Sequence, residues 1–362
     1  MKKVNILNNQ FLIESPLTTN KVILMIKFFM KQGLFFGTDF FKKSFSFFFI
    51  NFLIKKTIQT NLPKKLRKTL YSVLEDNYEK KYKLIGLVSL SFGGYIGIIK
   101  IKENYFILRI TYNKNQRNEK EKNGIKIFSQ ITKLKVPKLI FFEQINGFDI
   151  SIQTALYIPY FRDFYVPSKH ILLNTLGVII NEKSYDGLIS ESKGFRKTIQ
   201  FIESNLHDSP KWFKSWFLNF EWLNLDKLIG INSIGPIHGD INKNNCWYKN
   251  STLFLVDFEM FEDSSPMFID LIKWKLFGDL NLKPSVISKR VKRVLKKGIQ
   301  ETDLRQYGFD NFNKKEDLRA GILLITLLFE CYWILKRNIS FRNSYMHAIT
   351  SNIKYLIDFL NY

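Results

Sequence analysis

The chain is poor in cysteine, with only Cys246 and Cys331 among its 362 residues. Two thiols provide no disulfide framework, and their spacing matches no metal-ligand pattern. This scarcity favours a reducing, intracellular setting. No secretory signal is expected at the N-terminus, because Glu14 and Pro16 interrupt any early apolar run.

Uninterrupted apolar runs of membrane-spanning length are missing as well. The three candidates are Val22–Phe36, which carries two lysines, Phe45–Ile54, and Ile322–Leu335, which contains Glu330. A spanning helix needs about 20 apolar residues, so none of the three is expected to cross a membrane. Core helices are the favoured interpretation, and the first two runs would alternatively suit a membrane interface.

Acidic residues are few, with 32 Asp and Glu against 55 Lys and Arg, for a net charge of +23. Residues 1–70 hold 13 Lys and Arg against two acids. Three interpretations compete: attraction of phosphate-rich partners such as nucleotide, nucleic acid or an anionic membrane, a solvated face, and a composition biased toward Lys, Asn, Ile and Phe. The compositional bias is favoured for most of the charge.

A length of 362 residues is enough for two or three domains or lobes. Because 46% of the residues are hydrophobic, 35 of them Phe, the chain can bury a sizeable core. We expect an α+β fold in three parts. Residues 1–83 form a basic, Phe-rich, helical N-terminal extension. Residues 84–155 form a small antiparallel sheet with one helix, and residues 156–362 form a mainly helical lobe.

Periodicity places the elements of the small sheet. Three apolar runs between residues 84 and 112 are split by Gly93-Gly94 and Glu103-Asn104, which predicts three antiparallel strands. A helix follows from about residue 119 to 134, with Glu121 on the same face as its apolar residues. Two more strands are expected at 139–142 and 150–155. Further on, helices are predicted at 211–222, 268–277, 284–297, 315–336 and 344–360.

One stretch carries a chemical pattern. It reads His238-Gly239-Asp240, then Asn245, then a short apolar run, then Asp257-Phe258-Glu259. Each residue alone is more often a turn or capping residue. Together they reproduce the order in which kinases place a carboxylate that orients the acceptor hydroxyl, an amide, and a second carboxylate that holds metal on the phosphates. Asp240 is therefore the candidate base, and Asn245 and Asp257 are the candidate ligands of Mg²⁺.

Two neighbours in this block have supporting roles. His238, which we group with Asp240 in the catalytic loop, is expected to hold that loop by hydrogen bonding. A metal-ligand role is the weaker alternative, because no companion ligands stand near it. Glu259 adds either a second carboxylate or a hydrogen bond. A protein kinase has glycine at that position, so this chain is not one.

The first strands would cover a nucleotide. Gly93 and Gly94 allow backbone to approach phosphate closely, although an ordinary hairpin explains them nearly as well. Arg109 lies in the third strand, where kinases carry a phosphate-contacting lysine. Glu121, on the inward helical face, is its expected ion-pair partner. The competing interpretation makes both residues surface charges.

Taken together, these motifs resemble the aminoglycoside phosphotransferase and choline kinase-like superfamily. The resemblance is strong at residues 234–275, weak over the rest of 84–340, and leaves residues 1–80 unmatched. It implies a bilobal protein-kinase-like fold with ATP or GTP and Mg²⁺ in a cleft, and a small-molecule hydroxyl as acceptor. It also implies that Asp270 braces the catalytic loop and that Arg109 replaces the usual lysine.

The expected function is ATP-dependent transfer of a γ-phosphate to a hydroxyl of a sugar, an envelope-related compound or another small metabolite. The alternative is a catalytically weak, kinase-like scaffold that docks through its basic N-terminal region. We expect a cytoplasmic protein, with peripheral contact to an anionic membrane as an added option and no specific nucleic-acid binding. Nothing in the sequence specifies an oligomeric state.

Overall fold

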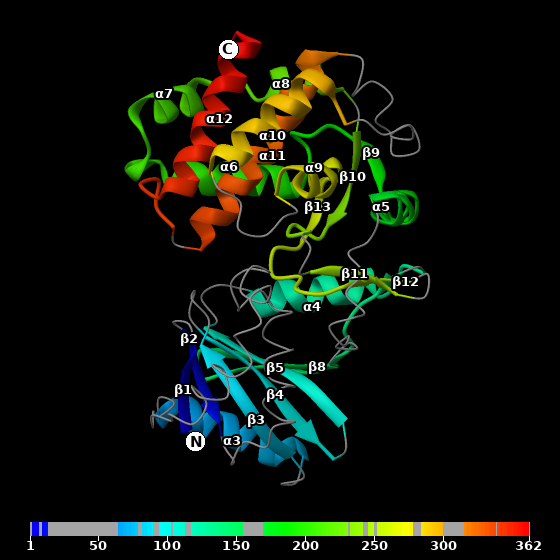
Figure 1. Cartoon of the computed structure of the whole chain (residues 1–362), viewed down its shortest axis with the longest axis vertical. Coiled ribbons are helices and arrows are strands. Elements are labelled where there is room, and N and C mark those ends of the chain that lie inside the picture. Colours follow the sequence, from blue (N-terminus) through cyan, green and yellow to red (C-terminus); the bar gives the residue numbers. More distant parts are fainter. Residues whose placement is uncertain are drawn as a thin grey trace, which may run out of the picture. The chain divides into compact units, whose positions relative to one another are not determined.

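The computed structural model describes residues 2–6, 9–13, 64–78, 82–89, 94–102, 104–112, 117–132, 134–154, 169–230, 232–241, 245–249, 252–277, 284–299, 315–337 and 339–361. Its contacts divide the chain into two units. The first comprises Met1–Ser129 with Lys135–Tyr165, and the second comprises Gln130–Leu134 with Val166–Tyr362 (Figure 1).

The first unit contains an antiparallel sheet of seven strands in the order β1-β2-β3-β4-β5-β8-β7. Their bounds are β1 Lys2–Ile6, β2 Asn9–Ile13, β3 Tyr82–Ser89, β4 Tyr95–Ile101, β5 Asn104–Tyr112, β7 Leu139–Ile145 and β8 Phe148–Thr154. The five strands expected between residues 84 and 155 are confirmed. Strands β1 and β2 differ from the helical structure expected at the N-terminus, and they extend the same sheet.

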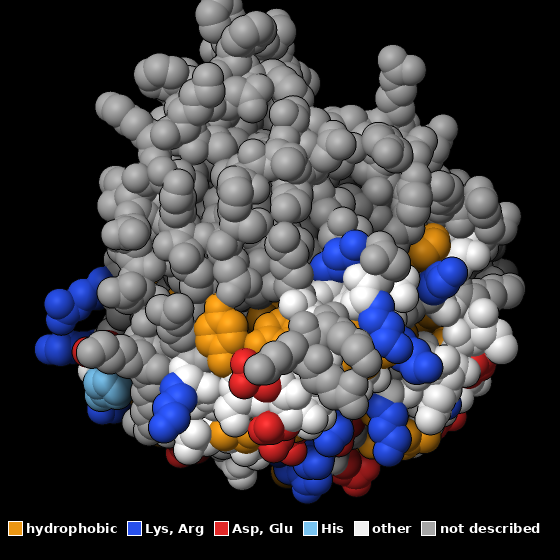
Figure 2. Space-filling model, turned by 90° about the horizontal axis from the view of Figure 1, so that it is seen from below, with side chains coloured by type: hydrophobic (Ala, Val, Ile, Leu, Met, Phe, Trp, Pro, Cys, Tyr) orange, Lys and Arg blue, Asp and Glu red, His pale blue; other side chains and the backbone are white. Residues whose placement is uncertain are grey.

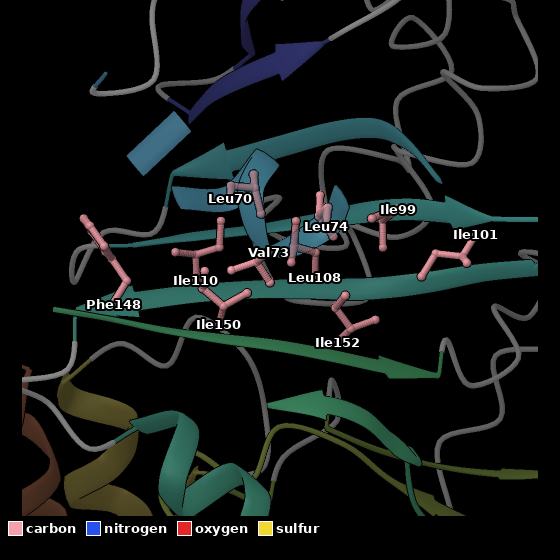
Figure 3. Close-up of a cluster of buried hydrophobic side chains, with 10 residues drawn as sticks. All are labelled: Leu70, Val73, Leu74, Ile99, Ile101, Leu108, Ile110, Phe148, Ile150 and Ile152. Atoms are coloured by element: carbon pink, nitrogen blue, oxygen red, sulfur yellow. The ribbon is translucent and has the colours of Figure 1, made fainter. Parts of the chain in front are cut away.

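Helix α3 (Lys64–Tyr78) covers one face of this sheet (Figure 3). Its Leu70, Val73 and Leu74 pack against apolar side chains that alternate along the strands, among them Leu108 and Ile110 of β5. Side chains point to opposite faces at every second residue of a strand. Residues between those apolar positions, such as Arg109, therefore face the other side of the sheet.

Helix α4 (Arg117–Phe128) packs against β5, β7 and β8 within the same unit. It is shorter at its C-terminal end than the expected helix at 119–134. Glu121 is 1% exposed, as the predicted inward face requires, and Ile125 and Phe128 are buried beside it. The face of the sheet opposite α3 thus combines one buried charge pair with apolar packing.

The second unit is built mainly from helices. Their bounds are α5 Lys169–Lys183, α6 Lys193–Ser204, α7 Lys211–Asn219, α8 Leu223–Ile229, α9 Phe268–Phe277, α10 Pro284–Lys297, α11 Glu316–Lys336 and α12 Ser344–Leu360. Helix α11 packs against α6, α8, α9, α10 and α12 (Figure 1). The predictions for α9, α10, α11 and α12 are confirmed at or within one residue of both ends.

Helix α11 is longer than the apolar run Ile322–Leu335 from which its membrane-spanning potential was judged. With the residues that precede its apolar run, it reaches 21 residues and is long and apolar enough to cross a membrane by length and composition. Of its most apolar window, 94% is buried inside the unit. Core packing against five neighbouring helices accounts for that composition, and a core helix was the favoured interpretation.

The expected single helix at 211–222 is also corrected, because α7 ends at Asn219 and Phe220 is extended. The break lets Trp222 turn back, so that its ring lies 5.0 Å from Phe217 and 5.9 Å from Phe195, measured between ring centroids. The gain from packing these large rings outweighs continued helical hydrogen bonding.

Two small sheets position the motif block. Strand β10 (Asn232–Ile237) lies between β13 (Glu262–Pro266) and β9 (Tyr185–Gly187). The hairpin of β11 (Cys246–Lys249) and β12 (Thr252–Leu255) forms the other sheet, whose third strand is β6 (Leu134–Lys135). The catalytic-loop motif follows β10, and the acidic motif follows β12.

The described surface charges are mixed on the face shown in Figure 2. Lys and Arg side chains lie among acidic and apolar ones there. Elsewhere, α10 concentrates basic residues, with six Lys and Arg and no acid in its 14 residues. Its apolar residues Ile287, Val291, Val294 and Leu295 are buried, which leaves the charges on its outer side.

Candidate active site

Asp270 holds the first turn of the catalytic loop. Its carboxylate accepts hydrogen bonds from two consecutive main-chain amides, that of His238 at 2.7 Å and that of Gly239 at 2.9 Å. Burial raises the pKa of Asp270, and the two amide hydrogen bonds and the charge of Lys273 oppose that rise. This contact is of the kind that the bracing role implied by the family resemblance would need.

Gly239 is required by both conformation and space. Its φ of +79° lies in the left-handed region, and a Cβ there would stand 2.2 Å from the carbonyl oxygen of Met260. No other residue fits without moving backbone. The carbonyl of Gly239 accepts a hydrogen bond from Lys273 Nζ at 2.7 Å, so α9 holds this residue at both its N–H and its C=O.

His238 lies beneath the loop and is fully buried. Its Nδ1 accepts from the Asp240 amide at 3.2 Å, and its Nε2 lies 2.9 Å from the carbonyl oxygen of Val256. The tautomer with hydrogen on Nε2 satisfies both contacts. The ring packs on Phe258, with centroids 4.6 Å apart. This geometry supports a loop-holding role, because a fully buried ring does not reach a substrate.

Asp240 and Asn245 are brought together, as their spacing predicts. The Asn245 side-chain amide donates to the main-chain carbonyl of Asp240 at 2.9 Å and to its carboxylate oxygen Oδ2 at 3.0 Å. Asn245 is buried, whereas the Asp240 side chain keeps 23% of its surface exposed. The carboxylate is therefore held in one orientation and can still be reached from solvent.

Asp257 is placed by the residue before it. The Val256 amide donates to the carbonyl of Asn245 at 3.0 Å, and the Val256 carbonyl faces the ring of His238. Asp257 itself has a φ of +70°, which is uncommon for a residue with a side chain. Such strained backbone clusters at functional sites, and here the surrounding hydrogen bonds maintain it.

One face of α11 forms the back of the site, and sequence reasoning missed it. Glu330, Trp333 and Arg337 recur at helical spacing along that face. Glu330 pairs with Lys273 Nζ at 2.8 Å, and the Trp333 ring centroid lies 3.7 Å from the same nitrogen. Lys273, which holds the Gly239 carbonyl, is thus fixed by α11.

Arg337 brings a cation to the carboxylates. Its Nη2 lies 3.7 Å from Asp240 Oδ2 and 3.7 Å from Glu259 Oε1. Burial lowers the pKa of Arg337, but the charges of Asp240, Glu259, Glu330 and Asp257 raise it by more. Glu259, the residue that replaces the protein-kinase glycine, therefore faces this guanidinium.

The first unit contains the other predicted pair. Arg109 Nη1 and Glu121 Oε2 are 3.4 Å apart, and their side chains are 8% and 1% exposed. The predicted ion pair is confirmed, and the surface-charge interpretation is wrong. Gln153 Nε2 also donates to Glu121, at 3.4 Å. Arg109 of β5 and Gln153 of β8 lie on the sheet face that α4 covers, and Glu121 reaches them from α4.

Gly94, directly before β4, has a structural requirement of its own. Gly94 has a φ of +105°, and a Cβ there would stand 2.3 Å from the carbonyl oxygen of Ile110. Close packing of β4 on β5 therefore requires this glycine in its own right. Gly93 lies outside the described residues.

The donor set fits a hard cation. Asn245 and Asp257 offer amide and carboxylate oxygens, which Mg²⁺ prefers, and it normally takes one or two protein carboxylates together with substrate phosphates. Within the described part of the chain, no group of three or more His, Cys, Asp and Glu could hold a metal alone. A site completed by phosphate oxygens is consistent with that finding.

Signals for the missed residues were weak. Lys273 stands three residues after Asp270, which places both on one face of a helix. Glu330 was visible only as a charge that interrupts an apolar run. Arg337 has no local signal, because it is nearly a hundred residues from Asp240 in the chain.

The antiparallel sheet of the first unit and the mainly helical second unit, in which the motifs follow β10 and β12, are those of a protein-kinase-like fold of the α+β class. Among solved structures, the chain is similar to choline kinase LicA from Streptococcus pneumoniae, with 14% identity, a TM-score of 0.51, and coverage of 81% of this chain and 99% of that one.

It is also similar to a thermostable mutant of aminoglycoside phosphotransferase APH(4)-Ia in a ternary complex with ADP and hygromycin B. That match has 10% identity, a TM-score of 0.51, and coverage of 79% of this chain and 97% of the other. No protein-family model matches the chain, and no curated protein matches it by sequence. The expected fold class is confirmed by the structural similarity.

Proposed function

We propose that the protein is an ATP-dependent small-molecule O-phosphotransferase. The observation that carries this proposal is the Asn245 side-chain amide bound to the Asp240 carboxylate at 3.0 Å, with Asp257 directly after the residue bonded to Asn245. Asp240 follows β10 and Asp257 follows β12, and the charges of both act on Arg337. This supports a site with the carboxylate, amide and second carboxylate that phosphoryl transfer requires.

Asp240 acts as the base in this proposal. The acceptor hydroxyl donates a hydrogen bond to its carboxylate and loses its proton to it as the new O–P bond forms. The bond between the γ-phosphorus and the leaving oxygen of ADP breaks on the opposite side. Asn245 and Arg337 hold the carboxylate in place, so catalysis comes from positioning and charge neutralisation.

Asn245 and Asp257 would hold Mg²⁺, which neutralises the developing charge on the phosphates. Arg109, paired with Glu121, is the proposed phosphate contact in the first unit, with ATP or GTP as donor. A guanidinium binds phosphate as a rigid fork, whereas a lysine offers a point charge. Gly93 and Gly94 remain the proposed backbone approach to the nucleotide.

The fold supports this proposal, because similar solved structures are a choline kinase and an aminoglycoside phosphotransferase bound to ADP. The acceptor we propose is a hydroxyl of a sugar, an envelope-related compound or another small metabolite. We place the protein in the cytoplasm, with its basic N-terminal region available for peripheral contact with an anionic membrane.

The test is an ATP-consumption assay across a panel of hydroxyl compounds, comparing the wild type with Asp240→Asn. We expect the variant to lose at least about a hundredfold in turnover, because an amide does not accept the proton. Asp263→Asn, an exposed acid on β13, is the matched control. Wild-type turnover in Asp240→Asn would overturn the assignment of the base.

The second candidate is a catalytically weak, kinase-like scaffold that docks through its basic N-terminal region. Arg109 at the position of the usual lysine favours it. A scaffold would bind Mg-ATP without consuming it for any acceptor, and its Asp240→Asn variant would behave like the wild type.

A further inference from the structure

Arg337, which helps to hold the Asp240 carboxylate, also places a permanent positive charge beside the candidate base. Arg337 stands at the C-terminal cap of α11, and its backbone amide is bonded to the last turn of that helix. Its guanidinium lies 3.7 Å from the carboxylate of the candidate base and 3.7 Å from Glu259. A charge at this position would affect which acceptor molecules bind beside Asp240.

We infer that Arg337 is the specificity-determining residue for the acceptor, and that it selects hydroxyl compounds that carry a carboxylate or phosphate group. This inference rests on the proposed function, because it assumes that the acceptor hydroxyl binds Asp240. It names a class of acceptor within the broader one given above.

Geometry places the acceptor near this cation. A hydroxyl that donates to the Asp240 carboxylate has its oxygen about 2.7 Å from a carboxylate oxygen. Since Oδ2 of that carboxylate is 3.7 Å from Arg337 Nη2, the acceptor hydroxyl lies within roughly 9 Å of the guanidinium. A charged group two or three bonds from the hydroxyl can reach that distance.

Exposure allows the contact. The side chain of Arg337 keeps 26% of its surface exposed and that of Asp240 keeps 23%, whereas Glu259 keeps only 10%. Both side chains are therefore partly open to solvent, whereas that of Glu259 is nearly buried.

The chemistry of the side chain favours an anion. A guanidinium is permanently charged and presents a planar fork that matches carboxylate and phosphate, so it can serve more than one anion. Arg337 Nη2 lies at ion-pair distance, 3.7 Å, from both Asp240 and Glu259. A cationic substituent at the same place would be repelled by Arg337.

The experiment uses the full chain saturated with Mg²⁺ and the non-hydrolysable ATP analogue AMP-PNP, which fills the γ-phosphate position. The probes are four three-carbon compounds of similar size: glycerol, glycerate, glycerol 3-phosphate and the cationic 2-amino-1,3-propanediol. Dissociation constants are measured by ligand-observed NMR for the wild type, Arg337→Gln, Arg337→Lys and Arg342→Gln. Arg342 is exposed and serves as the matched control.

We expect both anionic probes to bind the wild type about tenfold or more tightly than glycerol, as a unit charge at roughly 7 Å would produce, with the amine weakest. Arg337→Gln should reduce that ratio to within about twofold, Arg337→Lys should retain part of it, and Arg342→Gln should keep it. A merely structural Arg337 would change the affinities of all four probes together and leave their ratios unchanged.

The inference is overturned if the wild type shows no preference for anions, prefers the amine, binds none of the probes, or keeps its preference in Arg337→Gln. Binding of Mg-AMP-PNP itself is recorded first. Failure of that step would count against the proposed function, whereas nucleotide binding without anion preference would count against this inference alone.

Discussion

The side-chain amide of Asn245 donates twice to one residue, to the main-chain carbonyl of Asp240 at 2.9 Å and to its carboxylate at 3.0 Å. A single residue thus binds both the main chain and the carboxylate of Asp240 and fixes the direction of that carboxylate, before any ligand is considered.

Asn245→Ala should lower turnover by roughly tenfold to a hundredfold, because it removes a hydrogen bond to a charged group as well as the loop-closing bond. The measurement is kcat at saturating Mg-ATP. Asn205→Ala, which removes a 2.8 Å bond to the Phe201 carbonyl at the end of α6, is the control and should retain wild-type kcat. Equal kcat in the two variants would contradict the positioning role.

Gly239→Ala should destabilise the protein far more than Gly147→Ala. Both glycines have positive φ, +79° and +83°, so an alanine in either costs about 1–2 kcal/mol of backbone strain. Only at Gly239 would the new Cβ meet backbone, the Met260 carbonyl, whereas nothing lies within 4 Å at Gly147. The measurement is the urea concentration at the unfolding midpoint of each variant. Similar midpoints would show that the backbone around Gly239 shifts to accommodate the new Cβ.

Glu121→Gln should lower the free energy of unfolding by about 3–5 kcal/mol, because it leaves the buried charge of Arg109 without its carboxylate. Glu119→Gln, an exposed acid on the same helix, should change the free energy of unfolding by less than about 0.5 kcal/mol. Chemical unfolding followed by circular dichroism distinguishes them. A small effect at Glu121 would mean that Arg109 finds another anion or moves to solvent.

Stability should fall as pH rises above about 9, because burial, with the charge of Glu330 adding to it, raises the pKa of the Cys331 thiol above its ordinary value of 9.0. The folded chain keeps that proton, whereas the unfolded chain releases it. The stabilisation is complete below pH 9 and is lost as pH climbs. Burial and the charge of Asp270 act likewise on Cys246.

The free energy of unfolding, measured at several pH values between 9 and 10, gives the slope of stability against pH. Cys331→Ala should make the slope shallower by up to about 1.4 kcal/mol per pH unit, the value for one proton. Val294→Ala opens a buried cavity without removing a titrating group, so its slope should match the wild type. An unchanged slope in Cys331→Ala would show that the thiol ionises in the folded state.

Local patterns predicted the elements whose signals are local. Helices α9, α10 and α12 begin and end where periodicity and the flanking residues indicate, and β3, β4 and β5 follow their apolar runs and turns. The break of α7 at Phe220 was not predictable in this way. It depends on Trp222 reaching Phe195 of another helix, and no periodicity within residues 211–222 encodes that contact.

By itself, the sequence determined the α+β class, most helices and strands, and the candidate pattern of Asp240, Asn245 and Asp257, because each depends on residues close together in the chain. The tertiary structure alone decided that Lys273, paired with Glu330, binds the Gly239 carbonyl and that Arg337 stands beside the candidate base. Those contacts join residues up to about a hundred positions apart, and only the packing of α9 and α11 brings them within reach.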